Sequence, residues 1–171
     1  MFEALAVIPA EELSLRHEKC RRLLRELTPQ AGGLLVFSRP QVYYLTGTLG
    51  MGCVWLPLDG EPLLLLRKGV ARAALESPTV RCAAYRSYKD LPGLAAEAGV
   101  PFTDVVAVDQ SGLSWQLGEM LASRLSAHRF VSGAAFRKPF FAALIRRAPR
   151  RPSGCRARGR RRTGTRSRAC P

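Results

Sequence analysis

The composition of the chain changes abruptly toward its C-terminal end, and this change limits which part can fold. Residues 1–136 contain 14 Lys and Arg against 13 Asp and Glu, whereas residues 137–171 contain 13 basic residues and no acid. From Arg146 to Pro171 there is no Leu, Ile, Val, Phe, Tyr, Trp or Met. A segment without large apolar side chains cannot bury enough surface to offset the entropy of ordering. The sequence therefore predicts one folded domain over residues 1–136 and a disordered Arg-rich tail over residues 137–171.

The stretch from Pro40 to Leu58 carries no charge and is long enough to be considered as a membrane span. Its glycines, prolines and polar residues interrupt any helix, and lipid would not satisfy the freed backbone groups. We therefore expect no membrane span and interpret the stretch as a strand, a glycine-rich turn and a second strand. This second strand, residues 53–58, forms a predicted hairpin with residues 63–66 around a tight turn at Asp59-Gly60.

Helix and strand patterns alternate along the rest of residues 1–136, which is typical of a layered α/β domain. Apolar positions at helical spacing predict helices, and Thr28-Pro29 and Ser114 are suited to end one helix and begin another. Short apolar or alternating runs predict strands. The predicted helices span residues 9–27, 70–76, 89–98 and 114–125, and the other predicted strands span residues 33–38, 79–85, 104–109 and 128–132.

The cysteines give no indication of a disulfide framework or a zinc site. They are odd in number and irregularly spaced, without a CxxC pair. The start of the chain lacks a basic region before an apolar run, so no secretory signal is visible. We therefore expect a cytoplasmic protein in which Cys20, Cys53 and Cys82 are small buried hydrophobes. Cys155 and Cys170 lie among the tail arginines.

The run PQVYYLTG, followed by an uncharged strand and DGEPLLLLRK, resembles the N-terminal domain of the creatinase, prolidase and Xaa-Pro aminopeptidase family of metallopeptidases. The pieces VAVD and LSW further along fit the same pattern, and the resemblance covers about residues 15–130. It implies a three-layer α/β domain with a mixed sheet of ribonuclease H-like topology. This fold class agrees with the order of helices and strands predicted from the residue patterns.

In this family, catalysis belongs to a separate C-terminal domain, where two Asp, one His and two Glu hold a pair of divalent metal ions. The resemblance ends before that domain, and the two histidines, His17 and His128, lie in no acidic cluster of the kind such ions require. We therefore expect no catalytic, cofactor-binding or metal-ligating residue in this chain. The resemblance implies a non-catalytic accessory module that supports dimerisation, packs beside a metallopeptidase domain and limits access to short peptides.

The resemblance also implies a role for the loop of residues 46–52. In a dimer this loop would reach toward the active site of the partner subunit and shape substrate access. A plain connection between strands is the alternative interpretation, because most turn glycines serve the backbone. The loop has no Arg or Lys of its own to bind a carboxylate. Tyr43 and Tyr44, which precede the loop, are interpreted as alternating across a strand, so that one of them faces the core. The residues assigned to this candidate site are Tyr44, Gly47, Thr48, Leu49, Gly50 and Met51.

A second candidate site consists of three carboxylates that would resemble a nuclease centre. Asp59, Glu61 and Asp109 would have to come together for this chemistry. Asp59 is better suited to the tight turn and Asp109 to a strand end. We therefore favour these structural roles over the nuclease interpretation.

The Arg-rich tail leaves two further interpretations open. Its charges would bind nucleic acid by releasing counterions, although no aromatic residues interleave them to stack on bases. Its composition is also typical of an out-of-frame reading of a GC-rich gene, so a frameshifted or truncated peptidase fragment is the other hypothesis. A fragment would expose the surface that normally meets the metal domain and would self-associate, with Phe136, Phe140 and Phe141 in the apolar patch.

Overall fold

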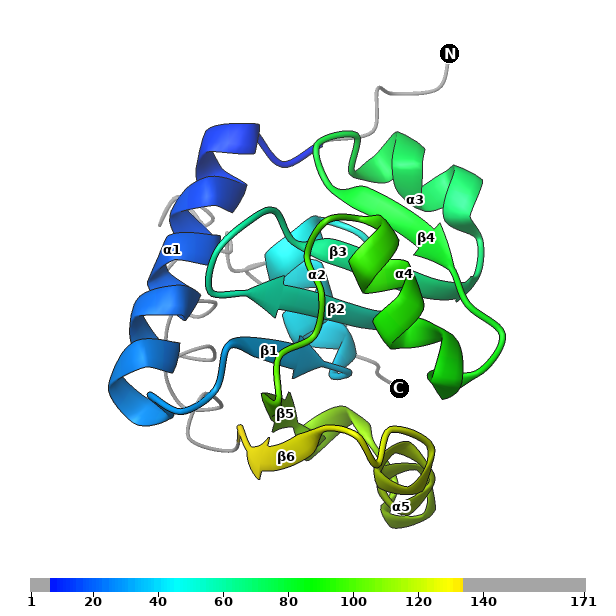
Figure 1. Ribbon diagram of the computed structural model, residues 1–171. Helices are drawn as coiled ribbons and strands as arrows, with labels where there is room; N and C mark the ends of the chain where they lie inside the picture. The colour runs from blue at the N-terminus through cyan, green and yellow to red at the C-terminus, as the bar shows by residue number, and fades with distance from the viewer. Residues whose placement is uncertain (1–6, 134–171) are drawn as a thin grey trace, which may run out of the picture.

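The computed structural model describes residues 7–133, which form a mixed sheet between two layers of helices (Figure 1). Four predictions lie outside the described residues and are not tested by them. They concern the domain boundary at residue 136, the Arg-rich tail, the three phenylalanines of the apolar patch and the two tail cysteines. The strands are β1 (Gly33–Val36), β2 (Met51–Pro57), β3 (Leu63–Lys68), β4 (Arg81–Ala84), β5 (Val105–Asp109) and β6 (Arg129–Ser132). The helices are α1 (Ala10–Leu27), α2 (Arg39–Thr46), α3 (Val70–Glu76), α4 (Leu91–Glu97) and α5 (Trp115–Arg124), with short 3-10 turns η1 (Tyr88–Asp90) and η2 (Gln110–Gly112).

The six strands of the sheet lie in the order β4-β3-β2-β1-β5-β6. Strand β2 is antiparallel to both of its neighbours, and every other adjacent pair is parallel. The predicted hairpin of β2 and β3 is therefore present, and helices provide the crossovers that parallel pairs require. The mixed sheet expected from the resemblance is confirmed.

Both faces of the sheet are covered, as the burial along β3 shows. Successive side chains of a strand point to opposite faces, yet none of the four residues Leu63, Leu64, Leu65 and Leu66 is more than 1% exposed. Leu64 and Leu66 pack in a cluster with side chains of α1, α2 and α3, whereas Leu63 and Leu65 pack with those of α4 and α5. The three-layer α/β/α architecture is thus confirmed.

The strand predicted at the start of the uncharged stretch is wrong, because residues 39–46 form helix α2. Pro40 occupies the first turn of this helix, where its missing N–H is no loss, and Gly47 ends it in the left-handed conformation. Val42 and Leu45 are buried three residues apart, which is helical spacing. Tyr43 and Tyr44 have a high β propensity, which explains the predicted strand, and packing of the segment on the sheet overrides that propensity.

The other predicted elements are present, with ends that differ by up to two residues. Helix α3 has the predicted bounds, and Ser114 caps α5 by accepting a hydrogen bond from the Leu117 N–H at 3.3 Å. Between residues 7 and 133, no helix is long and apolar enough to cross a membrane.

Candidate functional site

The end of α2 is held by two side chains of α1, and this contact sets the direction of the loop that follows. Arg16 Nη1 donates a hydrogen bond to the Tyr44 carbonyl at 2.8 Å. His17 Nε2 donates to the Leu45 carbonyl at 2.7 Å, since a carbonyl oxygen only accepts. Carbonyls at the end of a helix lack partners within the helix, so α1 supplies the missing donors. Gly47 then turns the chain with φ +81°.

His17 is a buried, neutral side chain whose Nε2 is engaged by the Leu45 carbonyl, not an accessible catalytic base. It is 5% exposed, and burial lowers its pKa below the ordinary value of 6.5, although the Leu45 carbonyl acts in the opposite direction. Burial disfavours the charged imidazolium, which explains the direction of the shift. His17 therefore serves to join α1 to α2.

The base of the loop is fixed by two buried threonines. Thr46 Oγ1 donates to the Val42 carbonyl at 2.8 Å and accepts from the Thr48 N–H at 3.2 Å. Thr48 Oγ1 in turn donates to Glu76 Oε2 of α3 at 2.5 Å, while Arg72 Nε donates to Glu76 Oε1 at 2.5 Å. These donors, Thr48 first, lower the pKa of the Glu76 carboxyl. The loop is therefore attached to α1 through α2 and to α3 through Glu76.

The tip of the loop is exposed and apolar. Leu49 is 52% exposed and Met51 is 65% exposed, although the threonine at position 48 beside them is buried. At Gly52 the β2–β3 register shifts, and a Cβ there would collide with the Leu65 backbone, so only glycine allows this close approach. The loop thus presents two large apolar side chains on a fixed base.

A hollow of about 370 Å³ lies between this loop and α3. Three basic side chains line it, each from a different element: Arg39 of α2, Lys68 of β3 and Arg72 of α3. The loop itself has no cation, as the sequence shows, and the sequence-based prediction of the site did not include these neighbours. The hairpin register pairs Met51 with Lys68, so extending the predicted hairpin by two residues would have brought Lys68 beside the loop.

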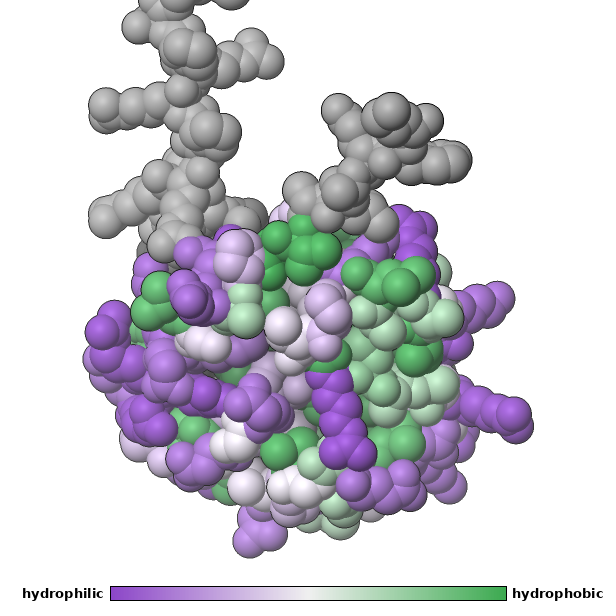
Figure 2. All heavy atoms as spheres, turned by 90° about the horizontal axis from the view of Figure 1, so that it is seen from above, coloured by the Kyte–Doolittle hydropathy of each residue, from purple (hydrophilic) through white to green (hydrophobic). Residues whose placement is uncertain are grey.

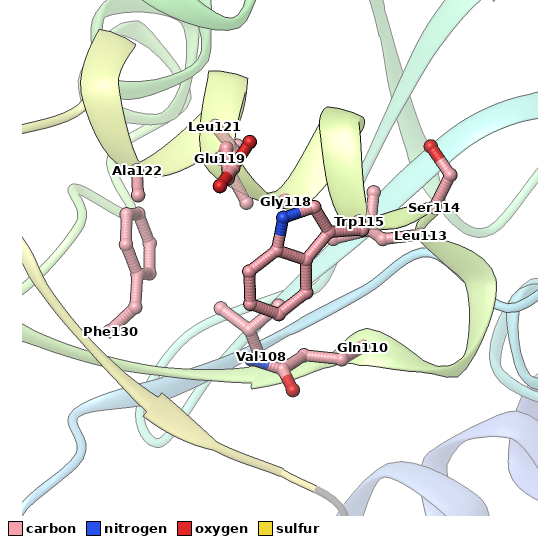
Figure 3. A pocket seen from close by; sticks show the side chains of 10 residues that line it. All are labelled: Val108, Gln110, Leu113, Ser114, Trp115, Gly118, Glu119, Leu121, Ala122 and Phe130. Atoms are coloured by element: carbon pink, nitrogen blue, oxygen red, sulfur yellow. The ribbon is translucent and has the colours of Figure 1, made fainter.

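A second hollow, of about 440 Å³, lies between α5 and the strands β5 and β6 (Figure 3). It is larger but mainly apolar, with Phe130 on one side and Trp115, which is 83% exposed, near Gln110 on the other. Within residues 7–133, Glu119 is the one ionisable side chain in its lining. Because these residues place no pair of acid, base or nucleophile side chains against the hollow, we place the candidate site at the loop instead.

The carboxylates of the predicted nuclease-like cluster are not brought together. Asp59 and Glu61 lie in the exposed β2–β3 turn, beside the start of β1, whereas Asp109 pairs with Val36 at the other end of β1. Asp109 is 1% exposed and accepts hydrogen bonds from the N–H and hydroxyl of Ser111. Asp59 thus lies in the turn and Asp109 at the strand end, as favoured, and the alternative nuclease cluster does not form because the sheet separates Asp109 from the other two carboxylates.

The described residues offer no fit to a pair of divalent metal ions. Within residues 7–133 no three His, Cys, Asp or Glu side chains lie close enough to hold a metal ion. His17 is bonded to a carbonyl, and His128 Nδ1 lies 2.9 Å from the Thr103 carbonyl. Two of the cysteines in this range, Cys20 and Cys53, are buried as expected, while Cys82 is only partly buried. We derive no metal-dependent step for these residues.

Solved structures with the same fold include several peptidases. The Xaa-Pro aminopeptidase (aminopeptidase P) of Streptococcus thermophilus superposes with a TM-score of 0.61 at 16% identity, covering 75% of this chain and 98% of that one. The N-terminal domain of the cytoplasmic peptidase PepQ of Mycobacterium tuberculosis gives 0.58 at 20% identity, covering 74% and 98%. The X-Pro aminopeptidase of Thermotoga maritima gives 0.61 at 14% identity, covering 73% of this chain but only 35% of that one. At these identities the likeness shows the fold.

Sequence comparison identifies the family directly. No curated protein sequence matches the chain. The family model of the Creatinase/Prolidase N-terminal domain matches residues 16–137, which is most of the chain and nearly all of the described domain. The chain therefore belongs to the Creatinase/Prolidase N-terminal domain family.

Proposed function

We propose that the described domain is a non-catalytic accessory module that packs beside a metallopeptidase domain and contributes its Gly47–Met51 loop to a neighbouring active site. The observation that carries this proposal is the contrast within the loop, whose base is fixed by buried hydrogen bonds while its tip exposes Leu49 and Met51. A loop that is held in place yet exposes apolar side chains is suited to contact another chain or a peptide.

The residues assigned to the loop have different roles in this proposal. Tyr44 is buried under the Arg16 guanidinium, whose carbon lies 4.8 Å from the ring centroid, so it supports the loop from below. Gly47 provides the turn, and Thr48 the attachment to α3. The exposed pair at positions 49 and 51 would make the contacts with peptide or partner.

The surface around the loop supports an interface with another protein. Figure 2 shows hydrophilic side chains gathered on the side where Figure 1 places α1, and apolar side chains gathered on the side of α3. Leu75 of α3 is 73% exposed. Apolar surface that is open to water on one side of a domain favours association, so we propose either self-association or contact with a metallopeptidase domain.

The solved relatives suggest the chemistry of the complete system. Their names describe Xaa-Pro aminopeptidases and a cytoplasmic peptidase. We therefore propose a peptide with proline in second position as the substrate class, and the cytoplasm as the compartment. The metallopeptidase domain, rather than the described residues, would hold the two divalent ions, and when bound such ions supply water activation and carbonyl polarisation.

A chimaeric enzyme tests this proposal. Residues 7–137, which include the whole of α1, would replace the N-terminal domain of the full-length Thermotoga maritima aminopeptidase. The oligomeric state of the chimaera and its kcat/KM for short and long Xaa-Pro peptides would be measured. We expect a dimer in which Leu49→Asp lowers kcat/KM at least about tenfold, because a charge replaces an apolar contact. Leu15→Asp, on the exposed side of α1, is the matched control and should leave kcat/KM unchanged. Equal kcat/KM values for both variants would refute a role of the loop in substrate access.

A further inference from the structure

The hollow beside the loop carries unbalanced positive charge. Arg39, Lys68 and Arg72 line it, and among the described residues of the lining Glu76 is the one acid. Glu76 is already engaged by Arg72 and by the Thr48 hydroxyl. Among the described residues, no carboxylate forms a salt bridge with Arg39 or Lys68. The lining therefore holds two cations in excess, in a concave surface that concentrates their field.

The arrangement of these cations matches one class of anion. They come from three different elements and converge on one hollow, so they suit an anion with several oxygens better than a planar carboxylate gripped by a single arginine. Arg39 Nη2 donates a hydrogen bond to the Leu49 carbonyl at 3.4 Å, but its charge, like that of Lys68, is not balanced by a carboxylate among the described residues. A phosphate group carries a charge of about −1.5 to −2 at pH 7, which balances these two charges. A carboxylate would balance only one of them.

The rest of the hollow has room for an organic group. Its volume of about 370 Å³ is well above what one phosphate group fills, and small-molecule sites begin at roughly this size. Leu49 and Met51 line the side formed by the loop, and both are more than half exposed. An apolar body attached to the phosphate would remove part of these side chains from water.

We propose that this hollow binds a small phosphomonoester, with the phosphate between Arg39 and Lys68 and the organic group against Leu49 and Met51. Arg72 stays paired with Glu76 and is not needed to contact the phosphate. The site goes beyond the proposed accessory function, because it requires neither a partner subunit nor a metallopeptidase domain. It gives the loop a ligand of its own.

Two-dimensional ¹⁵N NMR of the full chain, titrated with inorganic phosphate and with phenyl phosphate at ionic strength held constant with sodium chloride, tests the proposal. We expect saturable shifts in the amides of residues 49–51 and 69–72. Phenyl phosphate should bind about tenfold tighter than inorganic phosphate, because its ring buries apolar surface. Arg39→Gln and Lys68→Gln should each weaken binding about tenfold. Lys89→Gln, in η1 and away from the hollow, is the matched control and should bind like the unaltered chain.

Three results would overturn the proposal. The first is a set of shifts confined to residues 137–171, since the Arg-rich tail also attracts phosphate. The second is equal affinity in Arg39→Gln, Lys68→Gln and the Lys89→Gln control. The third is an unchanged preference for phenyl phosphate in Leu49→Ala, which should lose that preference while keeping its affinity for inorganic phosphate.

Discussion

The hydrogen bond between Thr48 and Glu76 should be measurable as a coupling free energy, because it is the contact that attaches the loop to α3. Thr48→Val removes the hydroxyl donor and keeps the shape of the side chain, while Glu76→Ala removes the acceptor. The salt bridge between Glu76 and Arg72 is lost in both arms that carry Glu76→Ala, so it cancels in a double-mutant cycle.

The size of the coupling follows from the surroundings of the bond. A hydrogen bond to a charged group contributes about 1.5–3 kcal/mol. The Glu76 side chain is 15% exposed, so water partly screens the bond, and Glu76 keeps Arg72 as a partner when the Thr48 hydroxyl is removed. Both effects reduce the contribution of the Thr48 hydrogen bond to stability. We therefore expect a coupling of about 1 kcal/mol in favour of the pair.

Urea denaturation of the full chain and of the three variants at pH 7 measures this coupling. The pKa of Glu76 is lowered from 4.5, so its stabilisation is present above pH 4.5 and is lost as the pH falls through the folded-state pKa. The coupling should therefore persist at pH 6 and shrink at pH 3. A coupling below about 0.3 kcal/mol at pH 7 would lie within additivity and refute the attachment of the loop to α3.

Three further predictions concern the core and its buried ionisable groups. Burial lowers the pKa of His17 from 6.5, so the folded state binds fewer protons than the unfolded state, and the free energy of unfolding should fall as the pH drops below 6.5. Urea denaturation across pH 5–8 should show that the free energy of unfolding depends less on pH in His17→Gln than in the unaltered chain. Leu64→Ala, at a fully buried position, should cost about 2–5 kcal/mol in urea denaturation, while Leu15→Ala, 65% exposed, should change stability by less than about 0.5 kcal/mol; equal effects would contradict the described core. Burial raises the pKa of Cys20 to about 12, so peptide mapping after iodoacetamide treatment at pH 8 should find this thiol unlabelled in the native chain and labelled in urea; native labelling would show that α1 does not bury it.

The fold was predictable because its elements have strong local signals. The hairpin of β2 and β3 follows from an uncharged strand, a tight turn and four consecutive leucines. Helix α2 was missed because the run VYYL has high β propensity, and the burial of Val42 and Leu45 against the sheet decides its conformation. Spacing of apolar residues was the better signal there than propensity.

The candidate site was only partly predictable, since it depends on elements far apart in the sequence. The resemblance indicated the loop, but the contact of Thr48 with Glu76 joins residues 28 positions apart. The basic lining likewise combines Arg39, Lys68 and Arg72, which no local pattern connects. For the same reason the sequence alone left the nuclease interpretation open as an alternative, since the separation of Asp59 from Asp109 depends on the register of β1 with its two neighbours.

The most direct test of the accessory role is a peptidase assay of the purified 171-residue chain with manganese or cobalt and an Xaa-Pro dipeptide. We expect hydrolysis no faster than in the metal-containing buffer alone, because residues 7–133 provide no cluster of metal ligands. Turnover that saturates with substrate and disappears on chelation of the metal would contradict a non-catalytic module.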